Sequence, residues 1–305
     1  MHMNSSTQPF VSIVMCVYNG EDYLEEQIDS ILNQTHSNFE LLILDDRSTD
    51  DSKDIIQRFL RKDSRIRYYE NNTNLGFNKN FEKGFSLSTG DLIAVSDQDD
   101  IWNENKIEKL VCNIGDHLLI YSNSTLIDES GRLLNRTLDC DVKHVDKPSY
   151  KSFLDGNFIT GHTCLFKKGL FTYAFPFPRK ISYYDWWLGF TASYVGEVKY
   201  LNETLTQYRI HTTSVIQEIE GAKGKQDIKS RDKYLQLESF AKADFLQSQD
   251  RKFIEKFVKR KSEANKGTLA FLTCYGFILQ HHKALYPWYN KSMVKKLNFL
   301  RKQCK

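Results

Sequence analysis

Short apolar runs alternate with amphipathic segments over roughly the first 125 residues. The apolar runs predict buried strands at 11–18, 39–44, 66–69, 91–95 and 118–121. The segments between them repeat apolar residues three and four positions apart, which predicts helices within 23–34, 55–60, 78–87 and 104–111. This alternation is typical of an α/β protein with a mostly parallel sheet. Because parallel strands joined by right-handed crossovers end at a common edge, ligands are expected at that edge.

The pattern becomes irregular after residue 123. Residues 123–148 are polar and rich in turn formers, and a hairpin turn is expected at 128–131. The following stretch is apolar and aromatic, and Asp185 is expected to begin a helix within it. Two short strands are predicted at 198–201 and 205–210.

From Gln217 onward the pattern is helical, with one predicted break at Pro287. We therefore expect two domains, a sheet-bearing domain over 1–216 and a helical extension over 217–305. The whole chain has 42 Lys and Arg against 39 Asp and Glu, but the two predicted domains differ in net charge. The extension holds 20 basic and 9 acidic residues, a net charge of +11, which leaves −8 for the first domain. Such a basic segment favours an anionic partner, either a nucleic acid or the anionic face of a membrane.

An apolar run of 12 residues, 268–279, lies within the extension. A bilayer span needs about 20 residues, so this run is too short to cross a membrane. It fits a buried core helix or an interfacial helix flanked by Lys266 and Lys283.

Six cysteines are scattered without C-x-x-C pairing, which predicts reduced thiols, no zinc site and a cytoplasmic location. The first ten residues lack the apolar segment of a signal peptide.

Three polar clusters follow predicted strands, at 18–19, 45–46 and 96–100. The last of them, Ser-Asp-Gln-Asp-Asp, holds three carboxylates within four residues. Carboxylates this close repel one another unless a cation offsets them, and a hard divalent cation is the expected one. An alternative is that the second cluster is simply a turn in which Asp46, Ser48 or Thr49, and Asp50 cap the next helix.

Taken in order, these segments resemble the inverting family 2 glycosyltransferases with a GT-A fold. The matching motifs are P-F-V-S-I-V at 9–14, Y-N-G at 18–20, Q-T at 34–35, D-D-R-S-T-D at 45–50, N-L-G at 74–76 and S-D-Q-D-D at 96–100. The likeness resumes at Gly161, with Y-D-W-W at 184–187 and Y-R-I-H at 208–211. The subgroup with these motifs resembles bacterial rhamnosyltransferases that build surface polysaccharides.

This resemblance implies a site for a nucleotide sugar. Tyr18 and Asn19 are expected beside a pyrimidine, and either Asp45 or Asp46 is expected to accept a hydrogen bond from it, which favours uracil or thymine. Further donor contacts are expected from Asn74, Lys79, Asp97 and Arg209. Arg209 suits either a phosphate or a buried carboxylate.

The resemblance also implies a divalent cation, Mn²⁺ or Mg²⁺, held by Asp99 and completed by His211. Asp100 is expected either to support a metal ligand without binding the cation itself, or to begin the next helix.

On the acceptor side, the resemblance makes Asp185 the general base. Tyr184 stands where the family commonly has Glu. Trp186 is expected to stack on a sugar, although a core position is the alternative for one of the two tryptophans at 186–187. Gly161 and His162 are expected near the acceptor.

The implied function is metal-dependent transfer from a UDP- or dTDP-sugar to a glycan or lipid-linked acceptor, with peripheral contact to the inner face of the cell membrane. One alternative is a sugar-1-phosphate nucleotidyltransferase, which would need a glycine-rich phosphate loop where this chain has Y-N-G-E-D at 18–22. Another is a nucleic-acid-binding protein, which the acidic first domain disfavours. A third is a non-catalytic protein that only binds a nucleotide sugar, which the presence of Asp97, Asp99 and Asp185 disfavours.

Overall fold

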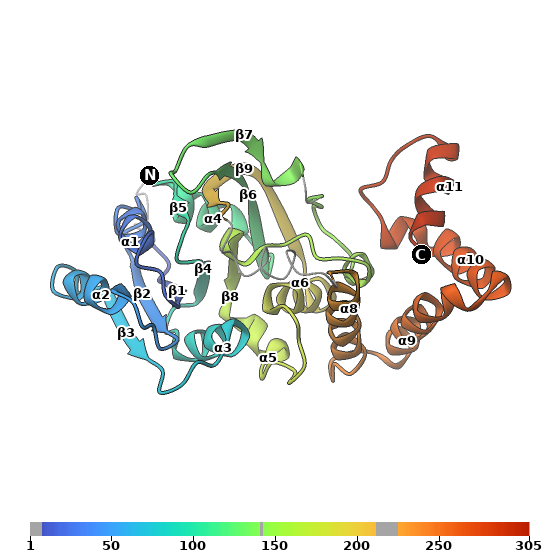
Figure 1. The fold of residues 1–305 in the computed structure, drawn as a ribbon, viewed down its shortest axis with the longest axis horizontal. Coiled ribbons are helices and arrows are strands. Elements are labelled where there is room, and N and C mark those ends of the chain that lie inside the picture. The colour runs from blue at the N-terminus through green and yellow to red at the C-terminus, as the bar shows by residue number, and fades with distance from the viewer. Residues whose placement is uncertain (1–7, 141–142, 212–224, 305) are drawn as a thin grey trace, which may run out of the picture.

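The computed structural model describes residues 8–140, 143–211 and 225–304. Within these residues nine strands form one mixed sheet in the order β3-β2-β1-β4-β8-β6-β9-β5, with β7 paired to β6 (Figure 1). The strands are β1 (Val11–Val17), β2 (Phe39–Asp45), β3 (Ile66–Glu70), β4 (Leu92–Ser96), β5 (Ile101–Trp102), β6 (Leu119–Ile127), β7 (Leu133–Thr137), β8 (Cys164–Lys167) and β9 (Val198–Arg209). Six strands run in one direction, and β5, β7 and β8 run against them. The predicted α/β class with a mostly parallel sheet is confirmed.

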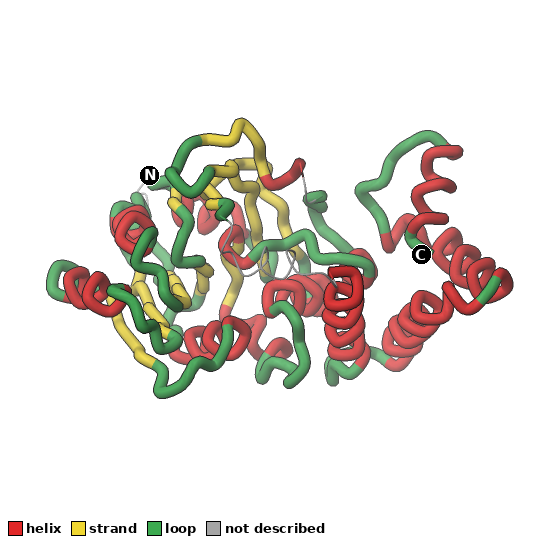
Figure 2. The backbone as a smooth tube through the Cα atoms, viewed as in Figure 1, coloured by secondary structure: helices red, strands yellow, loops and turns green. Residues whose placement is uncertain are grey.

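Helices cover both faces of the sheet, and helices alone make up the far end of the molecule (Figure 2). They are α1 (Leu24–Leu32), α2 (Ser52–Leu60), α3 (Phe77–Leu87), α4 (Lys106–Ile114), α5 (Phe171–Ala174), α6 (Tyr184–Val195), α8 (Lys225–Ala241), α9 (Ser248–Glu263), α10 (Thr268–Leu285) and α11 (Met293–Lys302). The helices predicted within the first 125 residues are confirmed, with ends that differ by a few residues.

Alternation along the strands produces two hydrophobic cores. Ile13 and Met15 of β1 face α1, α2 and α4, whereas Val14 faces α3 on the other side. Successive side chains of a strand point to opposite faces, so a strand buried on both sides is apolar throughout. This is why β1 and β2 appear in the sequence as continuous apolar runs.

The C-terminal helices pack onto the sheet-bearing part through α6. Phe240 of α8 stacks on Phe190 of α6, with ring centroids 3.9 Å apart. The buried Asp155 carboxylate is bonded by Lys233 of α8, Lys261 of α9 and Tyr286, which directly follows α10. These contacts fix the helices with both apolar and charged groups. The predicted domain boundary at 216–217 lies outside the described residues and stays a prediction.

Three local predictions are wrong. Ser48 and Thr49 do not cap α2, which begins at Ser52, because the Ser48 hydroxyl is bonded to Asp45 instead. The two short strands at 198–201 and 205–210 are one strand, β9, which is irregular where it pairs with β6. The extension breaks not only at Pro287 but also around residues 242–247 and at Gly267.

One side of helix α10 fits the core alternative considered for the apolar run, and the interfacial alternative stays a prediction. Cys274, Phe277 and Ile278 are buried, while Leu269 and Leu272 are 77% and 55% exposed. Among the described helices, none has both the length and the apolar character that a membrane span requires.

Candidate functional site

The acidic turn at 97–100 leaves the carboxyl end of β4, as predicted, and lies next to the end of β1. Gln98 joins the two segments, because its side chain accepts a hydrogen bond from the Tyr18 amide at 2.8 Å and donates to the Tyr18 carbonyl at 3.2 Å. A Cβ on Gly20 would lie 2.8 Å from the Gln98 amide group, so the glycine leaves room for this link. The Tyr18 ring is 50% exposed, which leaves a face open beside the acidic turn.

The two aspartates that end β2 are buried and organise the surrounding loops. Asp45 accepts hydrogen bonds from Ser48 and from the Tyr68 hydroxyl. Asp46 accepts three, from Asn71 and from the backbone amides of Leu75 and Gly76. Both carboxylates therefore shape the edge of the sheet near Tyr18, and which of them contacts a base stays open.

Asn19 lies in the same corner, with a positive φ of 48°. Its side chain accepts a hydrogen bond from the Thr49 amide at 2.8 Å, and its own amide donates to Ser48 at 3.0 Å. The Y-N-G and D-D-R-S-T-D motifs are thus physically joined.

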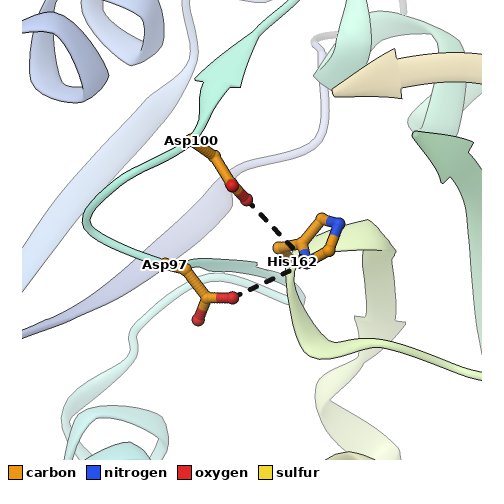
Figure 3. Close-up of side chains that lie close together, drawn as sticks. All are labelled: Asp97, Asp100 and His162. Carbon is orange, nitrogen blue, oxygen red and sulfur yellow. Dashed lines mark ion pairs between the residues drawn. The ribbon is translucent and has the colours of Figure 1, made fainter. Parts of the chain in front are cut away.

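A short turn of 3₁₀ helix, Gly161–Thr163, connects the acidic turn to the predicted base. The His162 ring is buried, and its Nδ1 lies 3.6 Å from Asp97 and 3.8 Å from Asp100 (Figure 3). The other ring nitrogen is 3.0 Å from the Ser124 hydroxyl, and the ring stacks on Tyr208 with centroids 4.7 Å apart. These contacts hold the imidazole in one orientation, with Nδ1 towards the carboxylates. His162, expected only near the acceptor, therefore lies against the acidic turn.

Asp100 is fully buried beside a buried lysine. One carboxylate oxygen accepts the Arg209 amide at 3.2 Å, and the other has no hydrogen-bond partner among the described residues. Burial raises the pKa of Asp100, nearby His162 opposes this, and the carboxylates at 97 and 99 add to the rise. The Lys106 ammonium donates to the His162 carbonyl at 2.6 Å and to Thr206 at 2.8 Å. Burial lowers the pKa of Lys106, and the charge of Asp100 opposes that change.

Asp99 and His211 lie together, with 2.7 Å between the carboxylate and Nε2. This hydrogen bond raises the pKa of His211. Arg209, two residues earlier, donates to the Asp99 carbonyl at 2.8 Å and to Glu26 at 2.6 Å. Its guanidinium also lies over the Tyr23 ring. The Arg209 guanidinium thus pairs with a carboxylate, but Glu26 is exposed and not the buried partner that was expected. The role of Arg209 towards a phosphate stays a prediction.

Asp185 is held in the first turn of α6 by two backbone amides. Trp186 donates to one oxygen at 2.6 Å and Gly161 donates to the other at 3.2 Å. Burial raises the pKa of Asp185 to about 7. The two hydrogen bonds lower this pKa, and the charge of Asp97 raises it further. A carboxylate with this pKa exchanges protons near neutral pH, as a general base must.

The remaining predicted residues differ in their exposure. Both tryptophans are buried, with the indole nitrogen of Trp186 donating to the Phe153 carbonyl and that of Trp187 to the Ala174 carbonyl. Both rings thus occupy core positions, which was the alternative to stacking on a sugar. Asn74 and Lys79 are exposed and lie around the start of α3.

Two residues of this site were missed by the sequence analysis, Gln98 and Lys106. Gln98 sits inside the acidic motif and had only its position as a signal. Lys106 opens an amphipathic helix, where a lysine is ordinarily solvated, so nothing in the local pattern marked it as buried.

Comparison with solved structures defines the class of the fold. Staphylococcus aureus TarS, solved with UDP-GlcNAc, superposes over 96% of this chain and 88% of its own, with a TM-score of 0.60 and 16% identity. A Pyrobaculum calidifontis mannosyltransferase, solved with GDP-Man and Mn²⁺, covers 98% of this chain and 86% of its own, with a TM-score of 0.53 and 14% identity. The protein therefore has the GT-A fold of glycosyltransferases.

The chain belongs to glycosyl transferase family 2, whose model matches residues 12–172. A Methanocaldococcus jannaschii glycosyltransferase is 31% identical over 67% of this chain and 71% of its own length. The Bacillus subtilis glycosyltransferase EpsH is 29% identical over 68% of this chain and 63% of its own. A Haemophilus influenzae glycosyltransferase is 38% identical, but the match spans only 36% of this chain and 35% of its own. Membership in this family counts against the nucleotidyltransferase and nucleic-acid-binding alternatives.

Proposed function

We propose that the protein is an inverting, metal-dependent glycosyltransferase that uses a UDP- or dTDP-sugar and extends a glycan or lipid-linked acceptor in surface polysaccharide synthesis. The observation that carries this proposal is the Gly161–Thr163 turn. It contacts Asp185 through the Gly161 amide and the acidic turn through the His162 ring. The proposed base, Asp185, and an acidic turn that could bind a cation and its diphosphate would thereby lie side by side.

A divalent cation fits this acidic turn. Ligand atoms of Asp97, Asp100 and His162 all lie within 4.8 Å of one another, and one buried oxygen of Asp100 has no hydrogen-bond partner within the described part of the chain. Carboxylate and imidazole ligands suit Mn²⁺ and Mg²⁺, which complete their shells with phosphate and water oxygens. Asp99 and His211, whose side chains lie 2.7 Å apart, are a second pair of groups that could bind the cation. When bound, the cation would offset the negative charge of the diphosphate.

The donor's nucleoside would lie beside the Tyr18 ring, in the corner built by Asn19, Asp45 and Asp46. Relatives in structure bind nucleotide sugars, UDP-GlcNAc in TarS and GDP-Man in the mannosyltransferase. A carboxylate that accepts the imide N–H of uracil or thymine explains a preference for those bases. Asn74 and Lys79 remain proposed donor contacts from the neighbouring loop, as does Arg209 from the end of β9.

Transfer would occur in a single displacement. Asp185 takes the proton from the acceptor hydroxyl, and the oxygen attacks the anomeric carbon of the donor. The bond from that carbon to the diphosphate breaks with its electron pair leaving on the phosphate oxygen. Attack from the face opposite the leaving group inverts the anomeric centre.

A panel of nucleotide sugars tests this proposal, with hydrolysis and thermal stabilisation measured with and without Mn²⁺. We expect at least one UDP- or dTDP-sugar to stabilise the protein, and its turnover to need the cation. Asp99→Ala and Asp100→Asn variants should each weaken Mn²⁺ binding measured by calorimetry, and the larger loss identifies the principal ligand. If no nucleotide sugar binds the folded protein, the proposal fails.

We further propose that the C-terminal helices dock on an anionic membrane. Leu269, Leu272 and Leu279 lie three and seven positions apart on one face of α10, and all three are exposed. Met293 and Val294, at the start of α11, are 73% and 71% exposed. The segment that carries them has a net charge of +11. Exposed apolar side chains among lysines are the usual composition of an interfacial helix.

Vesicle sedimentation tests the docking surface in the full-length protein. Vesicles that contain phosphatidylglycerol should bind the protein, vesicles of phosphatidylcholine should bind less, and raised salt should weaken binding. A double variant, Leu269→Ser with Leu272→Ser, should lose most of the binding. Leu133→Ser, an exposed leucine on β7, is the matched control. Equal binding by the double variant and the control would refute this surface.

A further inference from the structure

A cavity of about 250 Å³ lies outside the site described above, between the loop that follows residue 154 and the C-terminal helices. Its walls include Phe158 from that loop, Tyr286 and Trp288 from the segment between α10 and α11, and Phe299 from α11. Asp155 and Asn157 are polar lining residues of the loop. The cavity thus joins two parts of the chain far apart in sequence.

Aromatic rings dominate these walls. Trp288 lies 6.0 Å from the Phe158 ring and 5.8 Å from the Tyr286 ring, measured between centroids. Tyr286 in turn meets Phe299 edge-on at 5.2 Å. Trp288 and Phe299 are half-buried, so each keeps part of its surface towards the cavity. Rigid aromatic walls with a few polar groups are the usual lining of a small-molecule site.

The floor of the cavity is held by a charged cluster. Asp155 is bonded by Lys233, Lys261 and the Tyr286 hydroxyl, and Lys261 also donates to the Gln303 carbonyl. Both oxygens of Asp155 are occupied by these bonds. We therefore assign Asp155 the role of positioning the walls and not of contacting a ligand.

Two structural links connect this cavity to Asp185. Phe158 is three residues from Gly161, so their Cα atoms are at most about 11 Å apart, and the Gly161 amide donates to Asp185. In addition, Phe158 stacks on Phe153 at 4.3 Å, and the Phe153 carbonyl accepts the indole N–H of Trp186. The wall of the cavity is therefore linked to the two residues, Gly161 and Trp186, whose backbone amides hold the proposed base.

We propose that this cavity binds a saccharide unit of the acceptor, beyond the unit whose hydroxyl reacts. This inference rests on the proposed glycosyltransferase function. Sugar rings present C–H faces that pack on aromatic rings and hydroxyls that bond to amide and ammonium groups. Lys143 and Gln303 supply such groups in the lining, and the Asn157 amide, which is held by two hydrogen bonds to the backbone of Ile159, has one N–H left to donate. The nucleoside corner at Tyr18 lies at the end of β1, so the donor base has a separate place in the fold.

Tryptophan fluorescence tests binding without any need for turnover. The protein has four tryptophans, and Trp102, Trp186 and Trp187 are at most 5% exposed. Trp288 is therefore the expected reporter. Titration with mono- to tetrasaccharides of glucose, N-acetylglucosamine and rhamnose should change the emission of the wild-type protein. Phe299→Ala keeps the reporter but removes a wall, and it should weaken binding about tenfold. Tyr173→Ala, an exposed tyrosine on α5, is the matched control.

Kinetics then separate this inference from the proposed function. With a working donor and acceptor, Trp288→Ala and Phe299→Ala should raise the acceptor KM about tenfold. They should leave donor hydrolysis in the absence of acceptor near the wild-type value, measured below the thermal midpoint of each variant. If saccharides bind at Trp288 but no nucleotide sugar is used, the cavity assignment stands and the glycosyltransferase proposal fails. If sugar transfer occurs and both folded variants keep the wild-type acceptor KM, the cavity assignment is refuted.

Discussion

Replacing Asp185 with asparagine removes the proposed base while retaining the size of the side chain. A general base contributes about 10²- to 10⁴-fold to a rate, which corresponds to about 3 to 5 kcal/mol of transition-state stabilisation. We therefore expect kcat to fall by at least about a hundredfold. The donor KM and the dissociation constant for Mn²⁺ should change little, because the Asp185 carboxylate is hydrogen-bonded to the backbone amides of 161 and 186 and is not one of the grouped ligand atoms of Asp97, Asp100 and His162.

The pH dependence of the same variant gives a second, independent measurement. Burial raises the pKa of Asp185 to about 7, so the wild-type rate should rise with pH and level off above about pH 7. The residual rate of the variant should lack this rise.

Stability should change in the opposite direction to activity. A carboxyl group with a raised pKa in the folded state favours its protonated form, so ionisation costs stability as pH rises from the unfolded value towards 7. The wild-type protein should therefore lose stability relative to Asp185→Asn as pH rises from about 4 to about 7, measured by thermal unfolding. Asparagine offers one acceptor oxygen for the two amides, which reduces the gain at high pH. Transfer at the wild-type rate by Asp185→Asn, with the same pH profile, would show that the base lies elsewhere.

Three further substitutions probe groups that support the fold and site. Lys106→Met should destabilise the protein by about 1 to 3 kcal/mol in urea unfolding, because it leaves the His162 carbonyl and Thr206 without their buried donor. Asp155→Ala should cost about 1 to 3 kcal/mol, since it removes the buried acceptor of two partly buried lysines and of the Tyr286 hydroxyl; no loss of stability would contradict the anchoring role. Burial tends to raise the pKa of Glu40, but bonds from Ser12 and Thr89 lower it overall. The stability that ionised Glu40 contributes is therefore present above pH 4.5. It is lost as pH falls through the lower pKa that Glu40 has in the folded protein. The stability difference between wild type and Glu40→Gln should shrink between pH 6 and pH 3.

Local patterns were sufficient to predict most of the sheet-bearing part. The apolar runs that became β1, β2 and β4 are buried on both faces, so their composition alone marks them as strands. The polar clusters at 18–19, 45–46 and 96–100 were expected at one edge because each follows such a strand. Hydrogen bonds between Gln98 and Tyr18, and between Asn19 and Thr49, confirm that the segments meet there.

The contacts of individual side chains were harder to predict, because they depend on residues distant in sequence. Lys106 is buried by partners 56 and 100 positions away in the chain. Trp186 is enclosed by Phe153 and by Phe240 of α8, so its burial depends on the packing of the C-terminal helices. The motif Y-D-W-W identified the position of Asp185, but it did not indicate that both tryptophan rings would be buried.

The direction of one strand explains how the candidate site is assembled. β8 lies between β4 and β6 and runs against both, with Leu92 opposite Lys167 and Ala94 opposite Leu165. Because the pairing is antiparallel, residues that precede β8 lie beside residues that follow β4. The Gly161–Thr163 turn is thereby brought to the acidic turn at 97–100, although about 60 residues separate them in the chain. Had β8 run parallel to β4, the same turn would lie at the opposite edge of the sheet and His162 would be far from Asp97. The antiparallel strand, which the expectation of parallel crossovers did not include, is therefore what brings the turn that contacts Asp185, the proposed base, next to the acidic turn.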